Sequence, residues 1–371
     1  MTKLKGALVG FGQTAEKAHV PAYKRAPDFI IEAIVDEHPE RLELARAALP
    51  GARCYASIEQ LFQKETGLDF VDIATPPALH ARHITLSLQH RCHVLCEKPL
   101  ALHPKNFDSI RALCLSENRV VFCVHNWKYA PIFLKAAEMA RAGAIGAVRH
   151  AEFHTLRRAP ASDAGGPTWR LDPIVSGGGI LIDHGWHNFY LLQALMEGPA
   201  KTISAHLILP ESTGVEEEAL CIVQYPRATA LLYLTWRAHR RSNWGVLHGS
   251  AGTLELRDNL LVHAANDGAT TQIDFREKLS ESSAHPQWFQ TMLDTFRDEI
   301  RRPEKNHQNL QEAEACLNML IHAYESHRSG GKRITLPLPA PVLYAKSSRA
   351  PAGRLRPPAN SAAAAQERTA G

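Results

Sequence analysis

Short apolar runs alternate with amphipathic stretches over the first 125 residues, and this alternation restricts the chain to few folds. The apolar runs are KGALVG, FIIEAIVD, LDFVDIAT, CHVLCEKP and RVVFCVH. Such alternation predicts βαβ units and a parallel sheet. Because the runs are almost wholly apolar, we expect helices to cover both faces of that sheet. The predicted helices span residues 15–25, 39–48, 78–89 and 104–117.

Beyond residue 126 the alternation gives way to successive strands. A predicted helix over residues 131–142 and a strand over 148–158 come first. Strand-like runs joined by short turns follow, which favours a mostly antiparallel sheet. Two helical stretches, 286–301 and 310–327, are expected to close this second domain. The strand-like runs are TISAHLIL, EEALCIVQY, TALLYLTW, NWGVLHGS and TLELRD.

The predicted fold class is therefore α/β, with two domains and a tail. Residues 1–125 form the domain with the parallel sheet, and residues 126–338 form an α+β domain with a large, mostly antiparallel open sheet. Residues 339–371, rich in Pro, Ala, Ser and Arg, are predicted to be a disordered basic tail.

The formal net charge of +4 is confined to this tail, where five basic residues and one acidic residue follow position 340. The remaining chain is close to neutral, which argues against a nucleic-acid partner. No apolar run is long enough to cross a bilayer, and the first residues lead into a strand rather than an export signal. We therefore expect a cytoplasmic protein with no membrane partner.

The seven cysteines are scattered and form no CxxC pair. In QHRCHVLCEKP the spacing of His and Cys matches no common zinc pattern, and a strand would place Cys92, Val94 and Cys96 on one face. We expect small buried side chains here and no metal site.

A glycine-rich turn directly follows the first predicted strand. Glycine permits a tight turn and close approach to a pyrophosphate, and the N-terminus of the next helix offers free N–H groups. The second strand ends in an acid, at the position that binds ribose hydroxyls. This pattern predicts a Rossmann dinucleotide site made by Gly10, Phe11, Gly12, Gln13, Thr14, Ala15 and Asp36.

Asp36 also bears on the choice of cofactor. Its carboxylate would repel the additional phosphate of NADP, so NAD is predicted, while the nearby Arg41 leaves NADP open. The alternative role for Asp36 is to cap the helix that begins near Pro39.

Polar residues also end two later strands, where ligands of parallel sheets bind. Thr75 and Pro76 end one strand, and His80 follows in the first turn of a helix. His80 is either a cofactor contact or an ordinary helix residue. Glu97 and Lys98 end the next strand and are predicted to lie on the same side of the sheet.

Residues 177–190 read GGGILIDHGWHNFY, and their ionisable groups indicate either a satisfied buried network or a reaction site. Asp183 and His187 are four residues apart and would share one face of a helix. An imidazole can take a hydroxyl proton near neutral pH. His184 points elsewhere and could contact substrate, cofactor or solvent. A structural polar pair inside the helix is the alternative.

The order of these motifs resembles the glucose-fructose oxidoreductase, inositol dehydrogenase and rhizopine-catabolism (Gfo/Idh/MocA) family, from about Gly6 to Leu336. The resemblance rests on the glycine turn with Asp36, TPPALH, EKP, VHNWKYAP and GGGILIDHGWH. It implies that Lys98 hydrogen-bonds the reacting hydroxyl, that His187 exchanges its proton, and that Asp183 lies beside them. The implied activity is NAD-dependent interconversion of a secondary hydroxyl and a ketone on a sugar or cyclitol, in a homodimer or homotetramer.

The same resemblance indicates which residues line the sugar site. Lys128 stands where many relatives carry arginine, which keeps the charge but loses the bidentate fork. A mixture of arginine, tryptophan and acid suits hydroxyls and also a carboxylate or phosphate, although Arg157 could equally be a solvated strand end. The implied substrate residues are Asn126, Lys128, Arg157, Trp169, Arg170, Asp172 and His184.

Two other functions fit the same fold. A non-catalytic dinucleotide-binding sensor would be expected to lack Lys98 or His187, and both are present. A glycosidase that uses transient oxidation by NAD would be expected to carry an export signal, and no such signal is recognised here.

Overall fold

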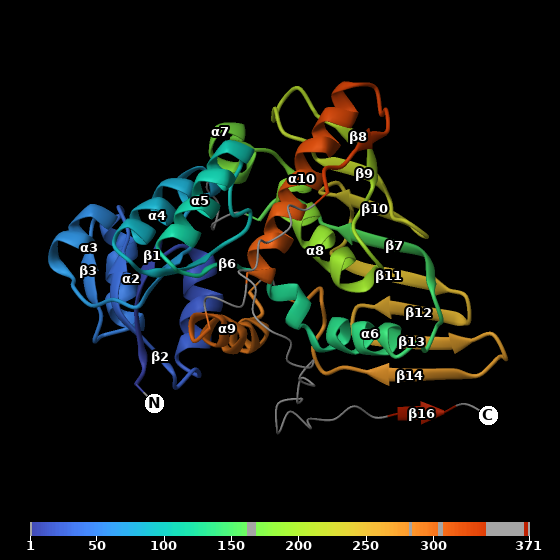
Figure 1. Ribbon diagram of the computed structural model, residues 1–371, viewed down its shortest axis with the longest axis horizontal. Helices are drawn as coiled ribbons and strands as arrows, with labels where there is room; N and C mark the ends of the chain where they lie inside the picture. Colours follow the sequence, from blue (N-terminus) through green and yellow to red (C-terminus); the bar gives the residue numbers. More distant parts are fainter. Residues whose placement is uncertain (1, 162–167, 282–283, 303–306, 339–366, 370–371) are drawn as a thin grey trace.

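The computed structural model describes residues 2–161, 168–281, 284–302 and 307–338, together with the backbone of a short strand at Glu367–Thr369. These residues build two sheets that lie side by side, each with its own helices (Figure 1). Most of the predicted tail lies outside the described residues.

The first sheet has six parallel strands in the order β3-β2-β1-β4-β5-β6. This is the doubly wound order of dinucleotide-binding domains, so the predicted parallel sheet is confirmed. The sequence pattern had not indicated β3, which is only three residues long. The strands are β1 (Leu4–Val9), β2 (Phe29–Val35), β3 (Arg53–Tyr55), β4 (Phe70–Ile73), β5 (His93–Cys96) and β6 (Val121–Cys123).

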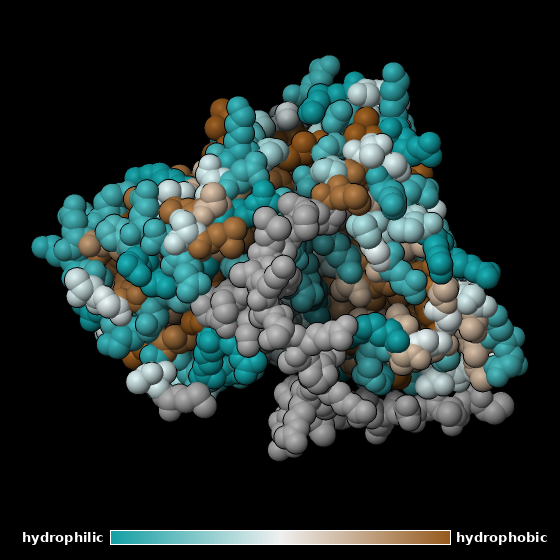
Figure 2. All heavy atoms as spheres, in the orientation of Figure 1, coloured by the Kyte–Doolittle hydropathy of each residue, from teal (hydrophilic) through white to brown (hydrophobic). Residues whose placement is uncertain are grey.

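Helices cover both faces of this sheet, as the apolar strands require. On one face Ile84, Leu88 and Ile110 pack against Val71 and Val94. Hydrophilic residues predominate on the visible surface of this domain, at the left of Figure 2, because the helices turn their apolar sides inward. The helices between the strands are η1 (Ala15–His19), α1 (Val20–Tyr23), α2 (Pro39–Ala48), α3 (Ile58–Lys64), α4 (Pro77–Gln89) and α5 (Pro104–Ser116).

The opposite face is completed by α9 (Pro286–Ile300), a helix from the far end of the chain. Its buried Phe289 and Phe296 join Leu8, Phe70 and Phe122 in one cluster. The expectation that this helix closes the second domain is therefore wrong. Its apolar side packs instead on the first sheet. There it covers the same face of the sheet as α1 and α2.

The second sheet has ten strands in the order β15-β8-β9-β10-β7-β11-β12-β13-β14-β16. All neighbours pair antiparallel except β7 and β10, so the predicted mostly antiparallel sheet is confirmed. The strands are β7 (Val148–Leu156), β8 (Thr202–Ile208), β9 (Glu218–Gln224), β10 (Thr229–Thr235), β11 (Ser242–Gly249), β12 (Gly252–Arg257), β13 (Leu260–Ala265), β14 (Thr270–Asp274), β15 (Ile334–Thr335) and β16 (Glu367–Thr369).

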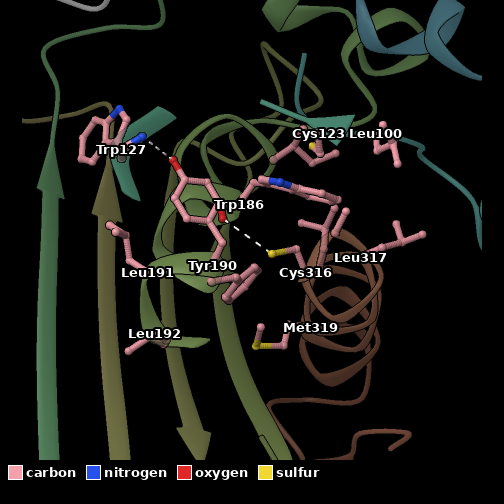
Figure 3. Packing of buried hydrophobic residues seen from close by; sticks show 14 of the residues in the cluster. Leu100, Cys123, Trp127, Trp186, Tyr190, Leu191, Leu192, Cys316, Leu317 and Met319 are labelled. Carbon is pink, nitrogen blue, oxygen red and sulfur yellow. Dashed lines mark hydrogen bonds between the residues drawn. The ribbon is translucent and has the colours of Figure 1, made fainter. Parts of the chain in front are cut away.

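Three helices cover one face of the second sheet: α6 (Pro131–Arg141), α8 (Trp186–Leu195) and α10 (Gln308–Arg328). Between α8 and α10, the buried side chains of Trp186 and Tyr190 lie against Cys316 and Met319 (Figure 3). This core fixes the position of α8. It thereby also positions His187, which lies in α8, and Asp183, which lies just before it.

The other face of the second sheet carries half-buried and exposed side chains, such as Tyr233 and Ile222. Pairing with a second copy through this face stays a prediction. In the part of the chain that the structure describes, no helix is both long and apolar enough to cross a membrane. Nor does any group of three or more His, Cys, Asp or Glu side chains among these residues have an arrangement that would hold a metal ion.

Candidate active site

A cleft of about 800 Å³ lies between the carboxyl ends of the first sheet and the second domain. Its volume falls in the range of small-molecule sites, roughly 300–1,000 Å³. The glycine turn and Asp36 line one end, and Lys98, Asp183 and His187 line the other. Residues from widely separated motifs thus share one cleft.

The glycine turn has the geometry of a phosphate cradle. Gly10 adopts φ +91°, and a Cβ there would come within 2.9 Å of the Ala74 backbone. Gly12 lines the cleft, and a Cβ added to it would meet no atom within 4 Å. The turn therefore leaves its backbone open to a large ligand, which fits the pyrophosphate of a dinucleotide. Phe11 and Ala15 have fully buried side chains and are not among the residues that line the cleft, so only their backbone is available to a ligand there.

Asp36 connects this turn to the end of β2. Its carboxylate accepts hydrogen bonds from Phe11 N–H at 2.7 Å and from His38 N–H at 2.9 Å. The N-cap residue of α2 is His38, so Asp36 is not itself the cap and contacts the start of this helix only through the His38 N–H, among the hydrogen bonds of the described residues. Asp36 also lines the cleft, together with Gln13 and Thr14.

Thr75 and Pro76 line the cleft at the end of β4, but His80 lies behind them. The His80 side chain is buried, and its ring nitrogens lie 2.7 Å from the Thr75 carbonyl and 2.8 Å from the Pro99 carbonyl. His80 therefore connects two strand-end loops and is not among the lining residues, so we correct its predicted direct contact with cofactor.

The three glycines before Asp183 permit a close crossing of two segments. A Cβ on Gly179 would lie 1.9 Å from the Glu216 carbonyl oxygen. Ile180 N–H donates to that carbonyl, and Leu181 N–H donates to the Glu216 carboxylate, each at 2.9 Å. These contacts place η4 (Leu181–Gly185) at the floor of the cleft.

Lys98 and Asp183 form an ion pair at this floor. Lys98 Nζ donates to Asp183 Oδ1 at 2.9 Å and to its backbone carbonyl at 2.5 Å. Burial alone would raise the pKa of Asp183, but the charges of Lys98, His184 and Arg170 hold it well below its usual range. Asp183 is therefore an ionised partner that orients Lys98 and not a proton donor.

His187 lies beside this pair, with its Nδ1 2.7 Å from the Tyr190 hydroxyl. That hydroxyl also accepts a hydrogen bond from Trp127 N–H at 3.1 Å. The tyrosine therefore fixes the imidazole ring and leaves Nε2 for the cleft. Burial, followed by the positive charge of Lys98, lowers the pKa of His187 well below 6.5. His187 is neutral at physiological pH and can accept a proton.

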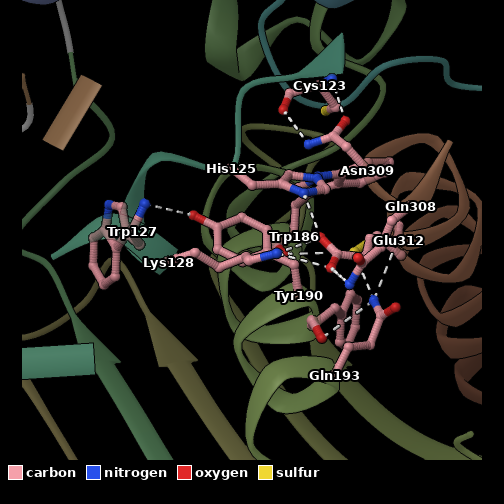
Figure 4. Close-up of polar contacts among 12 residues, drawn as sticks. Cys123, His125, Trp127, Lys128, Trp186, Tyr190, Gln193, Gln308, Asn309 and Glu312 are labelled. Atoms are coloured by element: carbon pink, nitrogen blue, oxygen red, sulfur yellow. Dashed lines mark hydrogen bonds and ion pairs between the residues drawn. The ribbon is translucent and has the colours of Figure 1, made fainter. Parts of the chain in front are cut away.

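Five of the predicted substrate residues line the same end of the cleft, namely Asn126, Arg157, Trp169, Arg170 and His184. Two do not. Lys128 points away and donates to both oxygens of Glu312, at 2.8 and 2.7 Å, in the buried polar cluster of Figure 4. Asp172 caps α7 (Pro173–Ser176) by accepting from Ile174 N–H at 2.9 Å. Both predictions are wrong because each side chain is already bound elsewhere: Lys128 to the Glu312 carboxylate, and Asp172 to the backbone of α7.

Sequence reasoning missed three residues of the site. Trp127 and Arg241 line the cleft, and Tyr190 orients His187. Tyr190 could have been found, because it is three residues from His187 on a helix and shares its face. No sequence signal marks Arg241, which lies in the connection between β10 and β11.

A buried network also lies beneath the EKP segment. His19 places Nδ1 2.7 Å from Asp72 and Nε2 3.1 Å from Glu97, and Tyr23 donates to Asp72 at 2.9 Å. Burial alone would lower the pKa of His19, but the two carboxylates outweigh it and raise the pKa to about 9. The His19 imidazolium therefore forms an ion pair with Glu97. Glu97, predicted to contact the cofactor, thus anchors the loop that carries Lys98.

This network predicts a stability that depends on pH. A His19 pKa raised from 6.5 to about 9 contributes stability that is complete below pH 6.5 and is lost as the pH rises through 9. The contribution is about 3 kcal/mol. Urea unfolding at several pH values should show the loss in the wild type and a flatter profile in His19→Gln. Exposed His239→Gln is the control, and parallel profiles for wild type and His19→Gln would contradict the prediction.

Family models match both domains of the chain. Residues 4–125 match the family model "Oxidoreductase family, NAD-binding Rossmann fold", and residues 133–255 match "GFO/IDH/MocA C-terminal domain". D-glucoside 3-dehydrogenase of Escherichia coli is 27% identical over 55% of this chain and 57% of its own. Levoglucosan dehydrogenase of Pseudarthrobacter phenanthrenivorans is 25% identical over 72% of this chain and 78% of its own. An uncharacterized oxidoreductase of Bacillus subtilis is matched over only 39% of its length.

Solved structures share the fold over nearly the whole chain. Levoglucosan dehydrogenase in complex with NADH and L-sorbose has a TM-score of 0.80 at 19% identity, covering 91% of this chain and all of that one (100%). An oxidoreductase from Agrobacterium radiobacter in complex with NAD+, L-tartaric acid and magnesium has a TM-score of 0.78 at 20% identity, covering 90% and 98%. With both of its domains matched by models of one family, the chain belongs to the Gfo/Idh/MocA oxidoreductases and has their NAD-binding Rossmann domain at residues 4–125.

Proposed function

We propose that the protein is an NAD-dependent dehydrogenase that interconverts a secondary hydroxyl and a ketone on a sugar or cyclitol derivative. The observation that carries this proposal is the meeting of Lys98, Asp183 and His187 in the same cleft as the glycine turn. A dinucleotide held by that turn would extend along the strand ends toward these side chains. The relatives named as sugar dehydrogenases support the same substrate class.

Each of the three side chains has a distinct role in this mechanism. NAD held at the turn would supply the hydride acceptor. Lys98 binds the substrate oxygen, and its ammonium group stabilises the negative charge that develops there. In the tautomer whose Nδ1–H donates to the Tyr190 oxygen, His187 takes the hydroxyl proton at Nε2 during oxidation and returns it during reduction. Asp183 holds Lys98 in place through the ion pair at 2.9 Å.

The proposal is tested by mixing purified protein with NAD or NADP and a panel of cyclitols, aldoses, sugar acids and sugar phosphates. Nicotinamide absorbance is followed in both directions. Turnover with one class supports a dehydrogenase. If the cofactor binds but no member of the panel reacts in either direction, the proposal is contradicted and a non-catalytic ligand sensor is favoured.

Asp36 is expected to set the preference for NAD over NADP. Asp36→Asn keeps an oxygen that can accept from Phe11 N–H but removes the charge. The ratio of kcat/KM for NAD to that for NADP should fall about tenfold, which corresponds to a loss of about 1.4 kcal/mol of discrimination. Steady-state kinetics with both cofactors measure this ratio. Glu43→Gln, an exposed change on α2, should leave it unchanged, and an unchanged ratio in Asp36→Asn would show that Asp36 does not select the cofactor.

A further inference from the structure

The two ends of the cleft differ in charge. Around the glycine turn, the lining includes four acids and three basic side chains, namely Asp36, Glu37, Glu40, Glu59, Lys17, Arg41 and Arg82. At the opposite end, the described lining residues include the basic side chains Lys98, Arg157 and Arg170 and two carboxylates, Asp183 and Glu97. Glu97 is already held by His19. Positive charge therefore exceeds negative charge where the substrate would bind.

Arg157 is the most deeply buried of these cations, with 3% of its surface exposed. Among the described residues, its terminal nitrogens donate only to neutral acceptors: the carbonyls of Leu156 and Ser242 and the side-chain oxygen of Asn243. Its Nε is buried without a hydrogen-bond partner among the described residues. Burial, and then the charge of Arg241, lower the pKa of Arg157 to about 9. A buried cation without a carboxylate partner is costly unless an anion binds nearby.

Arg170 adds a second positive charge at this end. Its guanidinium lies over the Trp169 ring, 4.4 Å from the centroid, and donates to the Ala161 carbonyl at 3.1 Å. Its Nε is 3.9 Å from Asp183 Oδ1, which Lys98 already occupies at 2.9 Å. Among the described residues, Asp183 is thus the carboxylate nearest to Arg170, and Arg170 shares it with Lys98.

We infer that the substrate carries an anionic group, a carboxylate or a phosphate, that binds against Arg157 and Arg170. This inference rests on the proposed dehydrogenase and specifies its substrate class. Arginine suits both anions, because its planar donors match their oxygens. The anion would balance the buried guanidinium charge and so fix the sugar with its hydroxyl toward Lys98 and His187.

The test compares matched anionic and neutral sugars binding to the protein saturated with NADH. Isothermal titration would use D-glucuronate and D-glucose 6-phosphate against D-glucose, and D-gluconate against D-glucitol. At least one anionic sugar should bind ten times more tightly than its neutral partner, with an affinity that falls as salt rises. The preference between glucuronate and glucose 6-phosphate distinguishes a carboxylate from a phosphate. If every anionic sugar binds no better than its neutral partner, the inference is overturned.

Variants locate the preference in the arginines. Arg170→Gln should weaken binding of the anionic sugar about ten times more than it weakens binding of the matched neutral sugar. Arg158→Gln, an exposed neighbour that does not line the cleft, should change neither. If Arg170→Gln weakens anionic and neutral sugars equally, the inference is also overturned. If an anionic sugar binds in a way that needs Arg170 but no sugar is turned over, the anion subsite is supported and the proposed dehydrogenase is contradicted. If only neutral sugars are turned over, the dehydrogenase is supported and the anion subsite is overturned.

Discussion

Replacing Lys98 with methionine is expected to lower kcat/KM by roughly a hundredfold to a thousandfold while cofactor binding persists. The ammonium group is the donor placed to stabilise negative charge on the substrate oxygen, and removing one such donor costs about this much. Methionine keeps most of the apolar stem, so the packing around Pro99 should survive. Steady-state kinetics and NADH fluorescence titration measure the two quantities separately.

The control for Lys98→Met is Lys105→Met, the same change at an exposed position on α5. It should keep wild-type kinetics. Thermal unfolding of both variants checks that the fold is retained. If Lys98→Met folds, binds NADH and still turns over at more than about a tenth of the wild-type rate, Lys98 does not have the proposed role.

Replacing His187 with glutamine should also lower kcat/KM strongly, by roughly a hundredfold to ten-thousandfold, which is the usual contribution of a general base. Glutamine keeps a polar group of similar size near the Tyr190 hydroxyl but cannot take a proton at neutral pH. The loss should be similar in both directions of the reaction, because the same nitrogen takes and returns the proton.

The pH profile separates proton transfer by His187 from mere positioning of the substrate. Burial lowers the pKa of His187 below 6.5, so the base is neutral and active above that pH. Oxidation by the wild type should therefore lose kcat/KM only as the pH falls below 6.5. His187→Gln should lack this acidic limb, whereas exposed His103→Gln should keep it. An acidic limb of the same shape in His187→Gln would assign the titration to another group.

Much of this architecture can be predicted because its causes are local. The apolar strands between amphipathic helices indicate a parallel sheet, and Gly10 with Asp36 indicates which strand ends bind the dinucleotide. The four-residue spacing of Asp183 and His187 correctly indicates that both side chains line one cleft. Asp183 lies in η4 and His187 in α8, which follows η4 directly. The assignment of Lys98 came from the resemblance, because nothing near it in sequence marks it as a partner of Asp183.

The remaining features depend on contacts between distant segments. An apolar stripe shows that α9 is buried on one side, but not that its partner is the first sheet. Likewise, Lys128 forms an ion pair with Glu312, which is 184 residues away in the sequence. The two side chains meet only because α10 packs beside α8. Sequence periodicity therefore determined the elements and the glycine turn. The tertiary structure alone decided which charges are neutralised and which, like Arg157, face the cleft, because the partner of a buried charge is set by packing and not by distance along the chain.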